Sequence, residues 1–326
     1  NIPEIGTGHL YRCLTIAKAL KKKFRLKNKE IVFLIKSSNK FEKNIKILSF
    51  YKFKIIKIKD SKLIPNSPEE IKYFTRNKAN LLIIDRLGKT NTNFFVRIKN
   101  SFKKKIIIDD SSSARKYFDL SLNPLIHNVA KFKKSHIGFK HLIIPAFFSK
   151  KKFTEKRNNI FVFFGGYDAK NITLKVVKIL NNLPIQLNLI IHDSLKEKIK
   201  KIYLRKNVLF FNNSNYLKLL QSSNIAIIAG GITLFDSIYF NKRIICIPQY
   251  KHQEINAKKI YVKKAINLIK VNDKNFKDLL IKTFVNTYEN RKMKQQIKVI
   301  QNRIINTAML KKTFKLIANL YEQSKS

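Results

Sequence analysis

Cysteine is scarce in this chain of 326 residues, and tryptophan is absent altogether. The two cysteines, Cys13 and Cys246, are too few for a disulfide framework, and the sequence has no CxxC motif or Cys/His cluster of the kind that binds zinc. We therefore expect no metal site, and we expect a protein of a reducing compartment, the cytoplasm. Long apolar runs are also missing, because none approaches the roughly 18–20 residues that a membrane-spanning helix needs.

Acidic residues are outnumbered by basic ones, 20 against 68, which gives a net charge of +48. The charge is spread evenly, with 34 basic and 10 acidic residues on each side of residue 150, so no basic tail or stripe is present to follow a phosphate backbone. Arginine interleaved with aromatic platforms, typical of single-strand nucleic-acid binding, is not evident either. We expect a solvated lysine surface without a specific nucleic-acid partner, one that attracts anionic small molecules and could associate peripherally with membranes.

Short β-branched runs alternate with amphipathic segments along the chain, which is the pattern of parallel α/β units. In the first half we expect strands at 31–36, 55–58, 81–85, 106–109 and about 119–122, with helices at 8–23, 40–50, 68–78 and 92–103. After a basic, irregular stretch at 145–158, we expect strands at 160–164 and near 186–191, 207–211, 225–228 and 243–247. The helices of this second half are expected near 170–181, 194–203, 214–222, 233–241 and 252–265, followed by a helical tail over 273–322.

These elements predict an α/β protein of two Rossmann-like domains that face a cleft, residues 1–148 and 149–326, with the tail in the second domain. The chain reaches a glycine-rich turn at residues 5–9 without a strand before it. Such a turn normally follows a strand, so we expect the first strand of the first domain to precede Asn1.

Glycine is used sparingly, yet six of the eight glycines form three close pairs: Gly6 with Gly8, Gly165 with Gly166, and Gly230 with Gly231. The second and third pairs each follow a strong strand pattern and precede a helix. Glycine at such turns allows sharp bends and close approach of a ligand, and helix N-termini favour anions. The alternative is a set of plain strand-to-helix turns. The chain has neither a P-loop nor a GxGxxG motif, so we expect no nucleotide cofactor of those types.

His9 follows Gly8 at the start of the first predicted helix, where the helix N-terminus disfavours an imidazolium. A neutral ring can accept a proton, so His9 is the candidate general base; a capping or packing role is the alternative.

In the second half, Thr233 stands at the N-terminus of a helix, where its hydroxyl and the following amides, beginning with Leu234, could hold a phosphate. Asp236 could accept ribose hydroxyls or complete a capping box. The polar loop that contains His252, Gln253 and Asn256 could bind sugar hydroxyls and phosphates.

The segments GTGHLYRC, IIDD, DLSLN, FFGGYDAKN, AGGITLFD and PQYKHQEINA occur in the order found in the UDP-sugar hydrolases of pseudaminic acid biosynthesis, which are related to the family-28 glycosyltransferases. The chain resembles that family to about residue 270. The resemblance implies a GT-B-like pair of domains, a UDP-sugar substrate held mainly by the second domain, and cleavage at the anomeric carbon with inversion and without a metal. It places the catalytic histidine at His9 and adds Arg12, Asp85 and Asp168 to the binding residues.

Three positions depart from the pattern of this family. Leu87 stands where the family often has tyrosine, Pro145 stands near the place of an arginine, and Asp236 is one methylene shorter than the family's glutamate. These departures leave the sugar open and keep a glycosyltransferase, in which His9 would activate an acceptor hydroxyl, as the alternative to a hydrolase. A UDP-sugar binder without activity is a further alternative.

Overall fold

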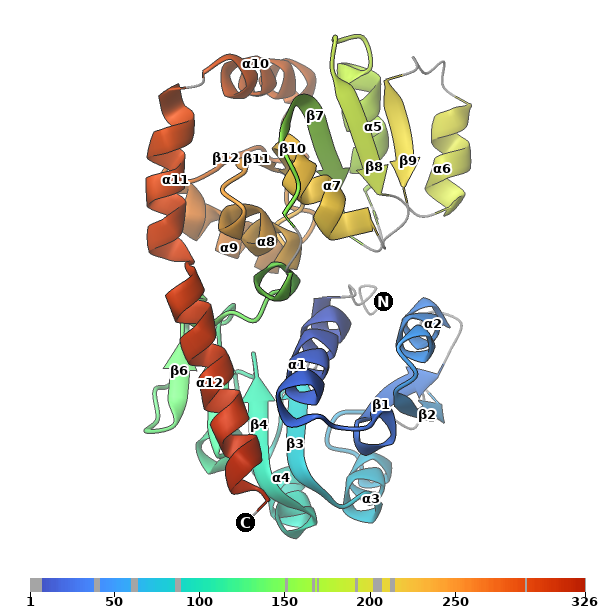
Figure 1. Ribbon diagram of the computed structural model, residues 1–326, viewed down its shortest axis with the longest axis vertical. Coiled ribbons are helices and arrows are strands. Elements are labelled where there is room, and N and C mark those ends of the chain that lie inside the picture. Colours follow the sequence, from blue (N-terminus) through green and yellow to red (C-terminus); the bar gives the residue numbers. More distant parts are fainter. Residues whose placement is uncertain are drawn as a thin grey trace. The chain divides into compact units, whose positions relative to one another are not determined.

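A computed structural model of the protein describes residues 8–37, 42–59, 64–85, 89–149, 152–165, 168, 170–190, 193–201, 207–211, 215–290 and 292–325 (Figure 1). Its contacts divide the chain into two compact units. The first comprises Asn1–Ile143 together with Thr307–Ser326, and the second comprises Ile144–Asn306. Each unit is an α/β body with parallel strands, as the sequence predicts.

The first unit contains two parallel sheets, β1-β2 and β3-β4-β5-β6. Its helices and strands are α1 (Gly8–Phe24), β1 (Val32–Ser37), α2 (Glu42–Phe50), β2 (Lys54–Lys59), α3 (Pro68–Arg76), β3 (Ala79–Asp85), α4 (Thr92–Ile98), β4 (Phe102–Ile108), β5 (Leu120–Asn123) and β6 (Ser135–Ile137). The sequence pattern does not predict β6, because its three residues, Ser-His-Ile, are too few to show an apolar alternation, and all three are half buried.

Helix α1 packs against both sheets because apolar residues lie on two of its flanks. Leu14 and Ala17 join a core cluster that is lined by Phe33 of β1. Ile16 and Leu20 join a second cluster with residues of β4 and β5. This double packing fixes the helix that carries His9 at its first turn.

The second unit has one six-stranded parallel sheet of order β9-β8-β7-β10-β11-β12. Its helices and strands are β7 (Lys156–Phe163), α5 (Ile172–Leu180), β8 (Gln186–Ile190), α6 (Asp193–Lys200), β9 (Val208–Phe211), α7 (Tyr216–Ser222), β10 (Ser223–Ile228), α8 (Ile232–Tyr239), β11 (Arg243–Cys246), α9 (Lys251–Tyr261), β12 (Asn267–Leu268), α10 (Phe276–Glu289) and α11 (Lys292–Ile304). The strand order is that of a Rossmann fold and reverses between β7 and β10, the place where ligands bind in such sheets. Both described glycine turns of this unit follow these two strands.

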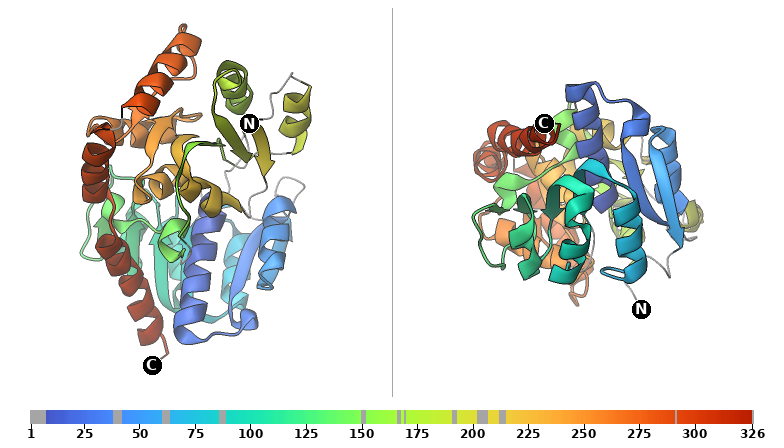
Figure 2. Two further views of the ribbon diagram at one scale, coloured as in Figure 1. Left: turned by 45° about the horizontal axis from the view of Figure 1, so that its top comes forward. Right: turned by 90° about the horizontal axis from the view of Figure 1, so that it is seen from below.

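The C-terminal tail is divided between the units, which the prediction of one domain over residues 149–326 did not anticipate. Helix α12 (Thr307–Gln323) belongs to the first unit, where Ile317 and Ala318 are fully buried against residues of β4 and β5 (Figure 2). Only α10 and α11 stay with the second unit. Helical periodicity shows that a helix has an apolar face, but it does not show which sheet covers that face.

Two strands begin four residues before their predicted starts. Strand β4 begins at Phe102, inside the predicted helix 92–103. Its Lys105 is buried, and the ammonium donates to the carbonyls of Lys99 and Phe102. Strand β7 begins at Lys156, inside the stretch expected to be irregular, where its first three residues are exposed. In both places lysines at the start of a strand conceal the strand pattern.

We expect Ile317→Ala to destabilise the first unit by about 2–4 kcal/mol, because it leaves a cavity against β4 and β5. Hydrogen exchange should show faster opening of β3 and β4 amides and unchanged protection of β10. The exposed neighbour Asn319→Ala is the control and should change stability by less than about 0.5 kcal/mol. Faster exchange confined to β10 would contradict the assignment of α12.

Candidate functional site

His9 lies in the first turn of α1, with its ring directed at the carboxyl end of β3. The ring Nδ1 is 2.5 Å from Oδ1 of Asp85, the last residue of β3. The Asp85 side chain is fully buried, whereas 27% of the His9 side chain is exposed. Gly8 is the first residue of α1, while Gly6 and Leu87 lie outside the described residues. The structure therefore brings together two of the predicted site residues that are 76 positions apart in the sequence.

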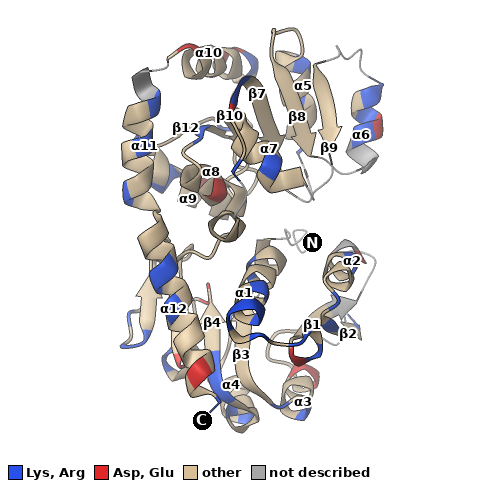
Figure 3. Ribbon diagram, in the orientation of Figure 1, with Lys and Arg blue, Asp and Glu red and all other residues tan. Residues whose placement is uncertain are grey.

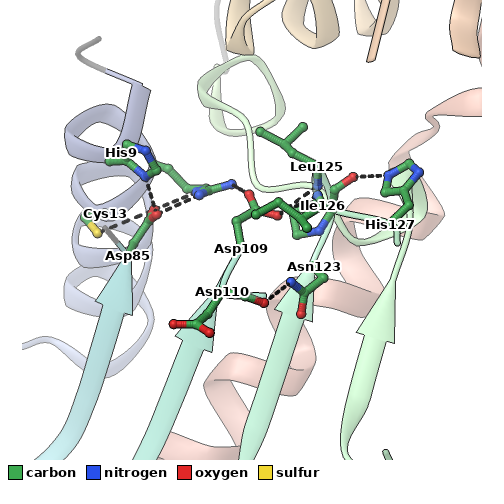
Figure 4. Close-up of polar contacts among 11 residues, drawn as sticks. His9, Cys13, Asp85, Asp109, Asp110, Asn123, Leu125, Ile126 and His127 are labelled. Atoms are coloured by element: carbon green, nitrogen blue, oxygen red, sulfur yellow. Dashed lines mark hydrogen bonds and ion pairs between the residues drawn. The ribbon is translucent and has the colours of Figure 1, made fainter. Parts of the chain in front are cut away.

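Arg12 holds the other side of the Asp85 carboxylate. Its Nε and Nη2 donate to the two oxygens of Asp85, each at 2.6 Å, and its Nη1 donates to Asp109 at 2.5 Å (Figure 4). Burial alone would raise the pKa of Asp85, but the charges of Arg12 and His9 hold it well below its ordinary value. Burial alone would lower the pKa of Arg12, and the two carboxylates raise it instead. Arg12 was predicted as a ligand contact, but it is buried and serves to hold Asp85.

The ionised state of Asp85 determines the tautomer of His9. An ionised carboxylate can only accept hydrogen bonds, so Nδ1 of His9 must donate to it. In the neutral ring the free electron pair then belongs to Nε2. A histidine held by a carboxylate in this way presents one nitrogen, in a fixed orientation, as a proton acceptor.

Asp109, the first aspartate of the IIDD segment, is a site residue that the sequence analysis did not select. Its backbone adopts a left-handed conformation with φ of 50°, which is unfavourable for a residue other than glycine. Its Oδ1 accepts from the amides of Leu125 and Ile126 at 2.9 and 3.2 Å, while Oδ2 accepts from Arg12. Asp109 thus ties the loop after β5 to Arg12. The sequence contains a signal for Asp109, because this residue ends the predicted strand 106–109 just as Asp85 ends the predicted strand 81–85.

Cys13 lies beside the same carboxylate, with its Sγ 3.9 Å from Asp85. Burial, reinforced by the charge of Asp85, raises the pKa of its thiol well above the ordinary value. A thiol in this state is a poor nucleophile, so the imidazole of His9 is the stronger candidate for a reactive group here.

In the second unit, the helix N-terminus after the β7 turn is capped by a side chain of the protein itself. Gly165 has φ of +89°, a conformation that requires glycine, and Gly166 lies outside the described residues. The carboxylate of Asp168 accepts from the amides of Ile172 and Thr173 at 2.9 and 2.7 Å, at the start of α5. Asp168 is predicted from the sequence as a ligand contact. In the structure its carboxylate lies at the N-terminus of α5, the place where an anionic ligand would bind.

The turn after β10 leaves the N-terminus of α8 without a side-chain cap. The helix begins at Ile232 with Gly231 as its N-cap, and the predicted capping box of Thr233 and Asp236 does not form. Thr233 is the second helical residue and is 9% exposed, and Leu234 is buried in the core. A Cβ at Gly230 would meet the carbonyl oxygen of Gln253 at 2.7 Å, while one at Gly231 would meet only the Gln253 amide at 3.8 Å. Gly230 is thus needed for packing, whereas a Cβ at Gly231 would make only an ordinary van der Waals contact.

The surroundings of the Asp236 side chain differ from those that the sequence predicts. Its side chain is fully buried, its Oδ1 accepts from the amide of Ala146 at 2.9 Å, and its Oδ2 accepts from the Tyr216 hydroxyl at 2.8 Å. Burial raises its pKa to about 7, and these two hydrogen bonds only partly oppose the rise. Both oxygens are used within the protein, so the structure does not support the expected contact with ribose hydroxyls. Pro145, the residue before Ala146, opens the short helical turn Pro145–Phe148 that Asp236 holds.

The polar segment at the start of α9 packs beside the two glycine turns. Gln249, the first residue of the predicted polar loop, is buried, and its side-chain amide donates to the carbonyl of Phe164 at 2.6 Å. Oε1 of Gln253 accepts from the backbone amide of Gln249 at 2.9 Å, and Nε2 of Gln253 lies beside Gly231. His252 is exposed and stacks on Tyr250, with ring centroids 5.7 Å apart. Asn256 is buried, and its Oδ1 has no partner among the described atoms.

No family model matches the chain. Among curated proteins, it is 28% identical over 276 residues to the uncharacterized protein MJ1062 of Methanocaldococcus jannaschii, covering 77% of this chain and 54% of that protein. It is 24% identical over 203 residues to the spore coat polysaccharide biosynthesis protein SpsG of Bacillus subtilis, covering 56% of this chain and 59% of that protein. The chain therefore spans somewhat more than half the length of these curated relatives.

Similar solved structures cover nearly the whole chain. They include MurG of Acinetobacter baumannii, with a TM-score of 0.63 and 14% identity over 96% of this chain and 97% of that one. The spinosyn forosaminyltransferase SpnP has a TM-score of 0.66 and 10% identity over 98% and 97% of the two chains. The spinosyn rhamnosyltransferase SpnG, complexed with thymidine diphosphate, has a TM-score of 0.61 and 12% identity over 95% and 97%.

These likenesses define the fold class: parallel α/β units with a helical C-terminal segment, the architecture of GT-B glycosyltransferases. In the part of the chain that the structure describes, no helix is long and apolar enough to cross a membrane. The same residues contain no group of three His, Cys, Asp or Glu side chains that could hold a metal ion.

The raised pKa of Asp236 predicts a pH-dependent stability. Because the folded-state pKa is about 7 and the ordinary value is 3.8, the folded state binds this proton more tightly. The resulting stabilisation is complete below about pH 4 and is lost as the pH rises to about 7. Asp236→Asn does not titrate; its Oδ1 can still accept from the Ala146 amide, and its Nδ2 can donate to the Tyr216 hydroxyl oxygen in place of the bond that Oδ2 accepts. Relative to wild type, its free energy of unfolding should therefore increase between pH 5 and pH 8, by roughly 1–3 kcal/mol. Urea denaturation at the two pH values measures this, and a constant difference would contradict it.

Proposed function

We propose that the protein is a nucleotide-sugar enzyme that releases UDP from a UDP-linked amino or deoxy sugar, with His9 as the general base acting on water. The observation that carries this proposal is the His9 ring, whose Nδ1 is held by the ionised Asp85 so that Nε2 is the accepting nitrogen. The names of the similar proteins support the substrate class: glycosyltransferases of this fold, one of them complexed with thymidine diphosphate, and a spore coat polysaccharide biosynthesis protein.

The nucleotide binds to the second unit, at the N-terminus of α8. First-turn amides of a helix point outward without intrahelical acceptors, and the helix dipole favours an anion there. At α8 the amide of Leu234 already donates to the Gly231 carbonyl at 3.0 Å, but Gly231 is the N-cap and the first turn has no carboxylate, so no acidic side chain opposes an anion there. At α5 the carboxylate of Asp168 already accepts from the first-turn amides and would repel a diphosphate. The charges therefore favour α8 over α5, with Gln253 beside it as a polar contact.

The reaction is an inverting displacement at the anomeric carbon. Nε2 of His9 takes a proton from water as the water oxygen attacks that carbon, and the bond from carbon to the β-phosphate oxygen breaks. The electron pair leaves with UDP, whose negative charge the α8 amides stabilise. Asp85 stabilises the imidazolium and remains ionised, since Arg12 holds its pKa low. Cleavage of a UDP-linked amino or deoxy sugar would serve nonulosonic acid or surface-polysaccharide biosynthesis.

A glycosyltransferase is the second candidate, because the similar solved structures are glycosyltransferases. The same base would then take a proton from an acceptor hydroxyl. Incubation of the protein with UDP-sugars in the absence of an acceptor distinguishes the two. A hydrolase releases UDP and free sugar without an acceptor. A transferase releases UDP only when an acceptor is added.

We expect Gly231→Val to weaken UDP binding at least tenfold, about 1.4 kcal/mol, because the side chain would fill the space beside the α8 amides. The fold should survive, since a Cβ at this position meets only the Gln253 amide at 3.8 Å. Calorimetry with UDP in EDTA measures the affinity. Asp168→Asn is the matched comparison at the other glycine turn and should leave the affinity within about threefold. Equal affinity of the Gly231→Val variant and wild type would contradict the assignment to α8.

We expect His9→Asn to lower turnover of the UDP-sugar by roughly 10²–10⁴, the usual contribution of general acid–base catalysis. UDP binding should stay within about twofold, because the nucleotide is assigned to the second unit. His127, which is half buried and bonded to the carbonyl of Pro124, is the control histidine. His127→Asn should keep near wild-type turnover. A His9→Asn enzyme with more than about a tenth of wild-type turnover would rule out His9 as the base.

A further inference from the structure

Arg12 contacts a second carboxylate, although two of its nitrogens already hold Asp85. Strands β3 and β4 are neighbours in which Asp85 pairs with Ile108, so Asp85 and Asp109 lie at the same edge of the sheet, as Figure 4 shows. Nη1 of Arg12 donates to Oδ2 of Asp109 at 2.5 Å. Acidic residues are few in this protein, 20 against 68 basic ones, and Figure 3 shows the basic residues spread over the helices of both units. Two buried carboxylates on one guanidinium are therefore an uncommon use of acidic residues in this chain.

The second carboxylate gives the buried cluster a net negative charge. The side chains of Asp85, Arg12 and Asp109 are only 0%, 2% and 5% exposed, and they comprise one guanidinium and two carboxylates. Without Asp109, the charges of Arg12 and Asp85 would largely cancel. With Asp109, the guanidinium is shared, so the negative charge of Asp85 remains available to an imidazolium at His9. Charges act strongly on one another in such a site, because little water is present to screen them.

The other titratable groups around this cluster do not supply the same charge. Cys13 lies beside Asp85, but burial raises the pKa of its thiol well above the ordinary value, so the thiol stays neutral. Asp110, the next residue after Asp109, binds other partners: its two oxygens accept from the amides of Thr90 and Ser112, each at 2.7 Å. Among the described residues that contact Arg12, Asp109 is thus the carboxylate added to Asp85.

The backbone of Asp109 is held in a conformation that directs its carboxylate at Arg12. The left-handed φ of 50° is unfavourable for aspartate and persists where surrounding contacts enforce it. The Asp109 amide donates to the carbonyl of Leu122 at 2.8 Å, and the amides of Leu125 and Ile126 hold Oδ1. These contacts leave Oδ2 for Arg12.

We propose that Asp109 is a positioning residue that makes His9 a stronger base, because it offsets the charge of Arg12 and leaves the charge of Asp85 to the imidazolium. Asp109 acts through Arg12 and Asp85 and does not touch the reacting atoms. This role rests on the proposed function, in which His9 takes a proton from water or, in a transferase, from an acceptor hydroxyl.

Histidine titration followed by NMR in the free protein tests the proposal without a substrate. The His9 signal is identified by its loss in His9→Asn. Asp109→Asn removes a negative charge that favours the imidazolium, so the midpoint of the His9 titration should move to lower pH by at least about 0.5 unit. Asparagine tolerates the left-handed backbone, and Asp109→Gly removes the same charge together with the strain. The two variants should therefore move the midpoint alike.

Asp110→Asn is the matched control, because it removes the same charge from the adjacent buried carboxylate, which does not hold Arg12. It should move the His9 midpoint less than half as far. In kinetics with a UDP-sugar, Asp109→Asn should lower kcat by about threefold to tenfold, because the base is weaker, and should keep KM within about twofold. The rise of its rate with pH should begin at lower pH than in wild type. Asp110→Asn should keep the wild-type pH profile.

An unchanged His9 midpoint in both Asp109 variants would overturn the proposal and leave Asp109 with a structural role alone. An equal displacement in Asp110→Asn would overturn it in favour of a general effect of buried carboxylates. A displaced midpoint in a protein that acts on no UDP-sugar would support the role of Asp109 and overturn the proposed reaction. The two proposals can therefore fail separately.

Discussion

The buried ion pair of Arg12 and Asp85 is the interaction on which the candidate site depends. Arg12 lies on α1, Asp85 ends β3, and Asp109 follows β4, so two carboxylates and one guanidinium fasten three elements at the same edge of the sheet. Removal of one partner from such a pair costs about 3–5 kcal/mol, since it leaves a buried charge uncompensated. The same pair keeps Asp85 ionised, and the ionised carboxylate sets the tautomer of His9. The same ion pair therefore contributes both to the stability of the first unit and to the orientation of His9.

The second unit uses its carboxylates differently. Asp168 caps α5 and Asp236 holds Ala146 and Tyr216, so both act as ligands of the protein itself. The α8 N-terminus carries no such carboxylate. A helix end without an internal anion is the place where an external anion gains most, because the orphan amides and the dipole remain uncompensated. The distribution of acidic side chains is therefore the reason why the proposed nucleotide site is assigned to α8 and not to α5.

The glycines illustrate how far a sequence pattern can be taken. Their pairing at strand ends identified both turns at the point where the strand order reverses, and the alternation of strand and helix patterns predicted the parallel α/β units. The pattern could not separate Gly230, where a Cβ would clash with the backbone of Gln253, from Gly231, where a Cβ would make only an ordinary van der Waals contact with the Gln253 side chain. Nor could it show that Arg12 serves Asp85, because the two residues are 73 positions apart in the sequence.

The sequence by itself determined the parallel α/β organisation, the positions of nearly all strands and helices, and the candidate base His9, because apolar periodicity and glycine turns are local features. Only the tertiary structure decided that α12 packs on the first unit, that Asp236 is buried with both oxygens engaged, and that Asp109 completes the ion-pair network. Each of these depends on which distant segment covers a given face or satisfies a given charge. That choice is made by packing and desolvation over the whole unit, and no local stretch of sequence contains it.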